Sequence, residues 1–311
     1  MATRPALLIT GLSGFLGWNL AQEAHRAWAV AGTYYRTPRR VVQAHFGAFA
    51  TGRIDLTQLQ EVREMLAATR PDVVIHAAAL ANPILCERYP DDSFRSNVVA
   101  TSVLANLCAE REIPLIFVST DLVFDGTRAP YREEDPVSPV NVYGEHKALA
   151  EEAALDSQER VAVCRMPLMF GPPSPTHGSF LQWMLPKMAQ GAVLHLFHDE
   201  YRTPVSAQVG ARGLLQVAGR FLSDAEEPPI VGRLHLGGRE RISRYGFGCL
   251  VQEVGGYAQA RLEPVSVHDF KGPAARPPDV SLDSERAYAA GYDPPPLREQ
   301  LRTVLHMVQE G

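Results

Sequence analysis

No long apolar run occurs in this chain of 311 residues, and that absence speaks against a membrane-spanning helix. A helix that crosses a bilayer needs about 18 consecutive apolar residues. The first apolar stretch, Ala6–Ile9, is also too short for the core of a secretory signal peptide. We therefore expect a cytoplasmic protein that does not associate with membranes.

Cysteine is scarce, and runs of a single charge sign are missing. The 4 cysteines, Cys86, Cys108, Cys164 and Cys249, form no Cys-x-x-Cys pair, so neither a disulfide framework nor a zinc site is indicated and no metal ligand is assigned. The formal net charge is −5, without a basic block that would favour nucleic acid. With 46% hydrophobic and 21% charged residues, the composition is that of an ordinary globular protein.

The first half of the chain alternates short apolar runs with helical patterns. Apolar strands separated by helices predict a parallel sheet that is covered on both faces. The expected strands are Ala6–Thr10, Ala29–Tyr35, Asp72–His76, Leu115–Ser119 and Val161–Met166, and the expected helices are Phe15–Ala27, Leu59–Thr69, Asp91–Arg111, Tyr143–Leu155 and Ala207–Phe221. The fold class is therefore α/β, a Rossmann-like doubly wound parallel sheet with a smaller C-terminal substrate-binding lobe.

The alternation breaks after Gly171, where prolines cluster. We expect a dinucleotide-binding domain over residues 1–170, with a return segment near 200–222. Residues 171–311 would form the smaller, interleaved substrate-binding lobe. Ligands of open α/β sheets bind beyond the carboxyl ends of the strands, so this lobe would cap that crevice.

Three glycines, Gly11, Gly14 and Gly17, lie between the first expected strand and the first expected helix. In this position, backbone amides at the start of the helix face a pyrophosphate, and the helix dipole favours its charge. The glycines permit the turn, the approach of the phosphates and close packing of the helix. The alternative is an ordinary tight turn between a strand and a helix.

The end of the second expected strand bears on the choice of cofactor. A carboxylate at this place binds the ribose of NAD, but the segment Thr33–Arg40 contains none. Arg36 instead suits the 2′-phosphate of NADP, with Arg39 or Arg40 assisting, unless the segment is merely a solvated basic loop. Asp55 follows a third expected strand and either accepts from the adenine amino group or caps the next helix.

Tyr143 and Lys147 are four residues apart on an expected helix, so they share one face. A phenol has an unperturbed pKa of about 10. A neighbouring ammonium stabilises the phenolate and lowers that pKa, which suits a proton donor in carbonyl reduction. A Tyr-x-x-x-Lys pair is also common on helix surfaces, and the spacing alone does not separate the two interpretations.

Thr120 and Asp121 end an expected strand at the edge where chemistry belongs. Thr120 would hold the substrate oxygen towards Tyr143, and Asp121 would contact substrate or tune the proton balance. Both residues are equally typical of a turn. Asn97 would hold its helix and a water that serves Lys147, or act as a buried structural amide.

These motifs together resemble the extended short-chain dehydrogenase/reductase family, over nearly the whole chain. The resemblance is strongest to its rhamnose reductase subgroup, whose C-terminal signature is similar to Arg276–Asp283. It implies that Thr120, Tyr143 and Lys147, with Asp121, form the catalytic set. It also implies a cofactor site made by Gly11, Ser13, Gly14, Phe15, Leu16, Gly17, Arg36, Asp55, Leu56, Ala77, Ala78, Ala79, Asn97, Tyr143, Lys147 and Met166.

The leading functional hypothesis is an NADPH-dependent reductase of a keto-sugar nucleotide, with NADH as a second option for the cofactor. Thr120, Asp121, Arg202 and Arg276 would bind this substrate, the arginines through its diphosphate, unless they form salt bridges between domains. One alternative is an NAD-dependent epimerase or dehydratase. Another is a non-catalytic subunit, since the regulatory subunit of methionine adenosyltransferase resembles the same subgroup. A homodimer is a further option for the assembly.

Overall fold

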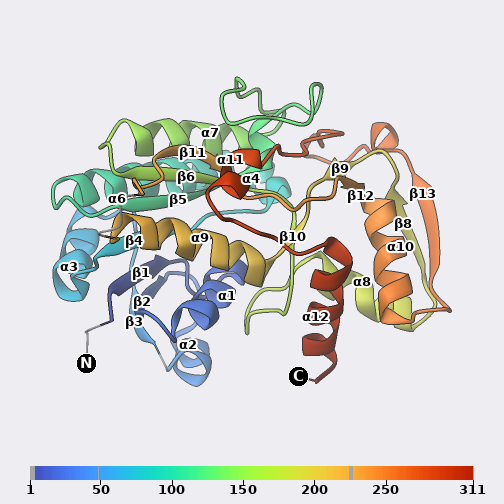
Figure 1. Cartoon of the computed structure of the whole chain (residues 1–311), viewed down its shortest axis with the longest axis horizontal. Coiled ribbons are helices and arrows are strands. Elements are labelled where there is room, and N and C mark those ends of the chain that lie inside the picture. The colour runs from blue at the N-terminus through green and yellow to red at the C-terminus, as the bar shows by residue number, and fades with distance from the viewer. Residues whose placement is uncertain (1–3, 48, 224–226, 311) are drawn as a thin grey trace.

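A seven-stranded parallel sheet forms the centre of the computed structural model, which describes residues 4–47, 49–223 and 227–310 (Figure 1). Its strands are β1 (Ala6–Thr10), β2 (Ala29–Tyr34), β3 (Ala50–Arg53), β4 (Val73–His76), β5 (Leu115–Thr120), β6 (Val161–Met166) and β11 (Gly232–His235). They lie in the order β11-β6-β5-β4-β1-β2-β3, and every neighbouring pair is parallel. The direction of winding reverses between β1 and β4, which confirms the predicted doubly wound fold.

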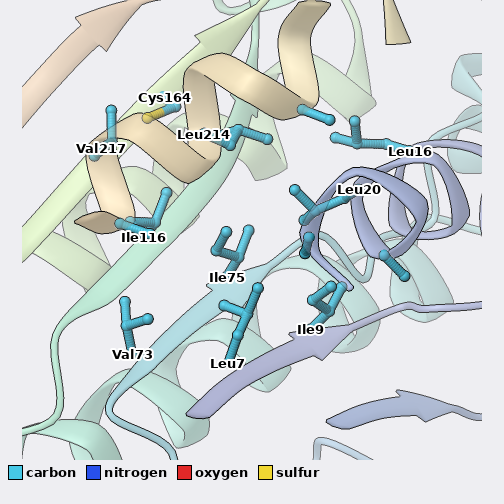
Figure 2. Close-up of a cluster of buried hydrophobic side chains, with 14 of the residues drawn as sticks. Leu7, Ile9, Leu16, Leu20, Val73, Ile75, Ile116, Cys164, Leu214 and Val217 are labelled. Atoms are coloured by element: carbon cyan, nitrogen blue, oxygen red, sulfur yellow. The ribbon is translucent and has the colours of Figure 1, made fainter. Parts of the chain in front are cut away.

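Helices cover both faces of the sheet. On one face α1 (Phe15–Ala24) packs against α9 (Ala207–Phe221), and on the other lie α3 (Leu59–Thr69), α6 (Ala100–Ala109) and α7 (Val142–Leu155). Successive side chains of a strand point to opposite faces of the sheet, and because helices cover both faces, the strands are apolar along their whole length. Figure 2 shows the apolar core on the first of these faces, between the strands and the helices α1 and α9. The labelled core residues are Leu7, Ile9, Leu16, Leu20, Val73, Ile75, Ile116, Cys164, Leu214 and Val217.

The smaller lobe lies beside the carboxyl ends of the strands and has an apolar core of its own (Figure 1). It consists of α8 (Phe180–Ala189), α10 (Arg244–Gly255), α12 (Leu297–Glu310) and the parallel pair β8 (Val193–Phe197) and β13 (Arg261–Val265). Two short pairs connect it to the sheet, β7 (Met169–Phe170) with β10 (Val205–Ser206) and β9 (Tyr201–Arg202) with β12 (Ile242–Ser243).

The remaining elements are short. They are α2 (Arg39–His45), α4 (Pro83–Arg88), α5 (Pro90–Phe94), the π-helical turn η1 (Arg95–Val99), the 3₁₀ turns η2 (Asp121–Val123) and η3 (Val267–Asp269), and α11 (Glu285–Ala289). In the described part of the chain, no helix is long and apolar enough to cross a membrane.

Two segments differ from the sequence-based prediction. The single helix expected over Asp91–Arg111 is divided into α5, η1 and α6, because a π-turn inserts around Asn97. The basic segment after β2 continues into the helix α2, since Val42 and Phe46 lie one turn apart and are both buried. The other predicted strands and helices are confirmed, with boundaries that shift by at most 3 residues.

Candidate active site

The glycine loop joins β1 to α1 at the point where the sheet reverses its winding. Gly11 has a φ of +72°, which a side chain rarely adopts, and a Cβ there would lie 2.7 Å from Ala78 Cα. A Cβ on Gly17 would collide with the carbonyl oxygen of Gly11. Gly14 is the residue before α1, so the first amides of this helix face the loop. This crowding explains why the loop contains glycines. Without side chains in the way, the amides at the start of α1 are available to an anion.

The segment after β4 lies directly against this loop. The Ala78 amide donates to the Thr10 hydroxyl at 3.3 Å. Asn97 fixes Leu80, two residues further along, since its Oδ1 accepts from the Leu80 amide at 2.8 Å and its Nδ2 donates to the Leu80 carbonyl at 3.2 Å. Ala77, Ala78 and Ala79 are therefore held beside the glycine loop, and Asn97 is a buried amide that anchors this segment.

The basic segment after β2 reaches the same loop. Arg36 is exposed, and the hydroxyl of the next residue, Thr37, donates to the Ser13 hydroxyl at 2.8 Å. The Thr57 amide and the Thr57 hydroxyl both donate to Asp55 Oδ1, at 3.0 Å and 2.7 Å, so Asp55 stabilises a local turn. The alternative in which Asp55 caps the next helix is wrong, because Gln58 is the residue before α3.

Three polar side chains that the sequence did not single out cover the glycine loop. The hydroxyls of Ser174 and Thr176 donate to the Ser13 carbonyl at 3.2 Å and 2.5 Å, and His177 Nδ1 lies 3.3 Å from the same oxygen. The sequence did not indicate these residues as part of the site, because they lie more than 160 residues after Ser13, in a proline-rich loop without periodicity.

The expected catalytic residues meet at the end of β5. Thr120 ends this strand, Tyr143 lies at the start of α7, and both side chains are buried. Burial raises the pKa of Tyr143 above its usual value, the charges of Asp121 and Cys86 act in the same direction, and Thr120 opposes them. The prediction that Lys147 lowers the pKa of Tyr143 is therefore wrong, and the phenol is protonated at neutral pH, which is the form that donates a proton.

Lys147 is buried one turn after Tyr143. Its ammonium donates to the Val118 carbonyl at 2.7 Å and lies 3.9 Å from the centroid of the Phe117 ring. Burial lowers the pKa of Lys147 to about 7, although the charge of Glu151 opposes this shift. The amine is thus directed at the backbone of β5, and at neutral pH both of its protonation states are accessible.

Asp121 connects the expected catalytic residues to the smaller lobe. Its Oδ1 accepts from the Thr120 hydroxyl at 3.2 Å, and its Oδ2 lies 3.5 Å from Arg202 Nε. Burial raises the pKa of Asp121 to about 6, although the Arg202 guanidinium lowers it. A carboxyl with this pKa changes its charge close to physiological pH.

Both predicted substrate arginines pair with one buried carboxylate, Glu200, which the sequence analysis missed. Arg202 Nη2 donates to Glu200 Oε1 at 3.0 Å, and Arg276 Nη2 donates to both carboxylate oxygens at 2.9 Å and 3.1 Å. Arg244 joins them through its Nε at 3.2 Å. We call Asp121, Glu200, Arg202, Arg244 and Arg276 the arginine cluster. Sequence spacing gave no signal for it, because Arg244 and Arg276 lie 44 and 76 residues after Glu200.

Some predicted cofactor residues direct their side chains elsewhere. Leu16 belongs to the apolar core (Figure 2), and Leu56 is buried under the other face of the sheet. Met166 packs against α9, where a Cβ on Gly210 would lie 2.7 Å from its methyl group. Phe15 is only the first residue of α1. Thr120, Asp121 and Tyr143, by contrast, are buried polar side chains at the end of β5 and the start of α7.

A doubly wound sheet with a glycine loop at its switch point, and a Tyr–Lys pair beside it, defines a protein of the extended short-chain dehydrogenase/reductase type. More specifically, the chain belongs to the RmlD substrate binding domain family, whose model matches residues 5–310. This membership confirms the resemblance to the rhamnose reductase subgroup.

Two relatives illustrate the range of the family. The chain is 30% identical to methionine adenosyltransferase 2 subunit beta of Bos taurus over 287 residues, which cover 92% of this chain and 82% of the relative. It is also 30% identical to a protein of Haloferax volcanii named "Probable low-salt glycan biosynthesis reductase" over 302 residues, which cover 94% and 95% of the two chains.

Solved structures share the whole fold. A dTDP-4-dehydrorhamnose reductase from Clostridium acetobutylicum aligns with a TM-score of 0.83 at 24% identity, covering 98% of this chain and 99% of that one. The enzyme of the same name from Bacillus anthracis, solved in complex with NADP, aligns with a TM-score of 0.82 at 20% identity, covering 98% and 100%. At these identities the likeness shows the fold.

Proposed function

We propose that this protein uses NADPH to reduce the ketone of a nucleotide-linked 4-keto-sugar, as a dTDP-4-dehydrorhamnose reductase does, with Tyr143 as the proton donor. The observation that carries this proposal is the buried Tyr143 phenol, whose protonated form is favoured by burial and by the neighbouring Asp121 at the carboxyl end of β5. A proton donor at this edge, close to a glycine loop, is what carbonyl reduction requires.

The residues present fit a bound dinucleotide. Gly11 and Gly17 admit no side chain, which leaves the amides at the start of α1 for a pyrophosphate. Arg36 is exposed after β2 and suits a 2′-phosphate. When bound, NADPH supplies the hydride that the carbonyl carbon receives.

The side chains of this protein supply the proton and the orientation. The Thr120 hydroxyl would hold the carbonyl oxygen towards Tyr143, and the phenol would protonate that oxygen as it becomes an alkoxide. Lys147, with a pKa lowered to about 7 by burial, is suited to restoring the proton from solvent. Asp121 would modulate this transfer through its hydrogen bond with Thr120.

Family membership supports a sugar nucleotide as the substrate class. The arginine cluster supports it as well, because guanidinium groups bind phosphate oxygens with paired hydrogen bonds. The cluster includes Asp121, which accepts from the Thr120 hydroxyl, so an anion bound to the arginines would place the attached sugar close to Thr120 and Tyr143.

The proposal is tested by fluorescence titration with NADPH and NADH, on protein first freed of copurified nucleotide. We expect reversible binding with a preference for NADPH, followed by NADPH oxidation when a nucleotide-linked 4-keto-sugar is added. NAD that stays bound through purification would point to an epimerase or dehydratase instead. Binding without turnover on any keto-sugar nucleotide would contradict the reductase.

A second candidate is a partner-binding subunit. It is favoured by the 30% identity to methionine adenosyltransferase 2 subunit beta over 92% of this chain. In that case the protein would form a stable complex with a methionine adenosyltransferase catalytic subunit. Size-exclusion chromatography of the mixture distinguishes the candidates, since a reductase needs no such complex for turnover.

A further inference from the structure

Ser13, in the middle of the glycine loop, is held by two other segments of the chain. Its side-chain hydroxyl accepts from the hydroxyl of Thr37, which follows β2, at 2.8 Å. Its carbonyl accepts from the hydroxyls of Ser174 and Thr176 at 3.2 Å and 2.5 Å. These two residues belong to residues 171–179, which we call the strap and which join β7 to α8, the first helix of the smaller lobe.

The Ser13 carbonyl depends on the strap for its hydrogen bonds. The first bond of α1 runs from the Trp18 amide to the Gly14 carbonyl at 3.1 Å, so the carbonyl of Ser13 lies one residue before the helix. Ser13 is buried, and a buried carbonyl without a partner is costly. The two hydroxyls of the strap supply the donors that this carbonyl needs. The strap is therefore part of the structure that maintains the glycine loop.

These contacts fix the peptide unit between Ser13 and Gly14 at both ends. Its amide donates to the Gly11 carbonyl at 2.9 Å, while its carbonyl is held by the strap. A peptide unit is planar, so fixing both ends fixes its orientation. The next amide is that of Phe15, which begins α1, and Gly14 has no side chain with which to cap this helix. The strap thereby sets the direction of the first amides that are offered to a pyrophosphate.

The strap is ordered by bonds of its own. The Ser174 amide donates to the His177 carbonyl at 2.7 Å, and the amides of Thr176 and His177 donate to the Ser174 hydroxyl at 3.2 Å and 2.9 Å. Three prolines among residues 171–179 restrict the backbone further. The hydroxyls of Ser174 and Thr176 are thus in place before a dinucleotide binds, which lowers the entropic cost of binding.

Each end of the strap is fixed to a helix. Asn19 of α1 donates to the Pro172 carbonyl at 3.2 Å, and Gln182 of α8 donates to the Gly171 carbonyl at 3.0 Å. Ser179 ends the strap as the N-cap residue of α8, in a capping box with Gln182. One anchor therefore lies in the helix that follows the glycine loop and the other in the smaller lobe.

We propose that Ser174 and Thr176 are positioning residues of the dinucleotide site, which act through the Ser13 carbonyl and slow the dissociation of NADPH. The inference rests on the proposed function, since the ligand is taken to be NADPH. A preformed strap leaves the rate of association unchanged. The pyrophosphate is common to NADPH and NADH, so the strap retains both cofactors equally, whereas Arg36 is expected to distinguish them.

The test is stopped-flow fluorescence, which measures the rate constants of association and dissociation of NADPH and NADH. Thr176→Val removes the hydroxyl and keeps the shape of the side chain. The loss of one hydrogen bond should accelerate the dissociation of NADPH by about fivefold, with the association rate constant within about twofold of wild type. NADH should dissociate faster by the same factor. Thr176→Ser retains the hydroxyl and should keep the wild-type rates.

Thr69→Val is the matched control, because the Thr69 hydroxyl also donates to a backbone carbonyl, that of Met65 at 2.8 Å, in α3 on the opposite face of the sheet. It should change neither rate constant. Ser174→Ala removes a donor to Ser13 and also the acceptor of two strap amides, so it should accelerate dissociation by about tenfold or more. If Ser174→Ala does not fold, the comparison of Thr176→Val with Thr69→Val still decides.

Dissociation that Thr176→Val leaves unchanged would overturn the inference and leave the proposed function standing. Association and dissociation rate constants that rise together would also overturn it, because they describe a lid that obstructs both directions. An effect on NADPH alone would contradict a role at the pyrophosphate. Faster release of a retained NAD in Thr176→Val would support the positioning role and count against the reductase, whereas a wild type that binds neither dinucleotide would overturn both.

Discussion

Arg165 on β6 and Glu151 on α7 form a fully buried ion pair with two parallel hydrogen bonds, Nε to Oε1 at 3.0 Å and Nη2 to Oε2 at 2.7 Å. The Ser119 hydroxyl donates to the same carboxylate at 2.5 Å. Glu151 lies one turn after Lys147, and Ser119 immediately precedes Thr120. The pair therefore fixes the two elements, β5 and α7, that carry the expected catalytic residues.

Removal of the carboxylate should destabilise the protein strongly. Glu151→Ala leaves the Arg165 guanidinium as an uncompensated buried charge, so we expect a loss of about 3–5 kcal/mol in the free energy of unfolding. Urea denaturation followed by circular dichroism measures it. The control is Glu253→Ala, because Glu253 makes the same paired contacts with Arg298, at 2.7 Å and 2.8 Å, on the surface. A comparable loss in both variants would contradict the structural role of the buried pair.

Tyr143→Phe isolates the role of Tyr143 as the proposed proton donor. The variant keeps the ring and loses only the hydroxyl, so NADPH affinity should stay within about twofold of wild type while kcat falls by about 100-fold or more. Fluorescence titration measures the affinity, and NADPH absorbance measures the turnover. A variant that retains wild-type turnover would remove Tyr143 from the mechanism.

The stability of the protein should depend on pH through Lys147. Burial lowers its pKa to about 7 in the folded chain, against about 10.4 for an unfolded lysine. Between these values the unfolded state binds the additional proton, so wild-type stability gains as the pH rises through this window. Lys147→Met lacks this titration. The free energy of unfolding of wild type relative to the variant should therefore rise from pH 7 to pH 10, and a constant difference would contradict the buried amine.

The glycine loop should tolerate no side chain. In Gly17→Ala the new Cβ collides with the Gly11 carbonyl oxygen, so we expect a loss of stability of about 2 kcal/mol or more and weaker NADPH binding. Gly219→Ala is the matched control in α9, where a Cβ meets nothing within 4 Å. It should be neutral or stabilising by up to about 1 kcal/mol, because alanine favours a helix. Thermal unfolding of both variants tests the pair.

Arg36→Glu tests the preference for a phosphorylated cofactor. The substitution removes a cation and adds an anion where the 2′-phosphate is expected, so NADPH should bind about 100-fold more weakly. NADH lacks this phosphate and should lose far less. Arg26→Glu makes the same charge change at an exposed position after α1 and should leave both affinities nearly unchanged. Equal losses for NADPH and NADH in Arg36→Glu would exclude Arg36 from the 2′-phosphate site.

The fold was predictable from the sequence because its signals are local. Strand β6 and helix α9 lie where their apolar patterns place them, since burial on a sheet imposes a regular period. The division of the helix around Asn97 was not predictable, because helical periodicity does not reveal a π-turn, and the Asn97 side chain bonds to Leu80 in another segment. Likewise α2 was missed, since its buried residue Val42 and the following Phe46 pack against partners elsewhere in the chain.

The site was predictable in part for the same reason. Glycine spacing and the Tyr143–Lys147 pair are short motifs, and the fold brings both to the carboxyl edge of the sheet. Glu200 had no such signal, because its three arginine partners belong to different segments and only the tertiary structure gathers them. The hydrogen bond from Lys147 to the Val118 carbonyl could not be predicted either. Helical spacing indicates on which face of the helix a side chain lies, but not which group it contacts.

The most direct test of the account is a single-turnover reaction with NADPH, purified protein and dTDP-4-dehydrorhamnose, in which NADPH absorbance and the sugar product are followed together. The account predicts stoichiometric NADPH oxidation, with one 4-hydroxy sugar nucleotide formed for each NADPH consumed. Bound NADPH that is not oxidised, or an isomerised sugar that forms without net oxidation, would contradict it.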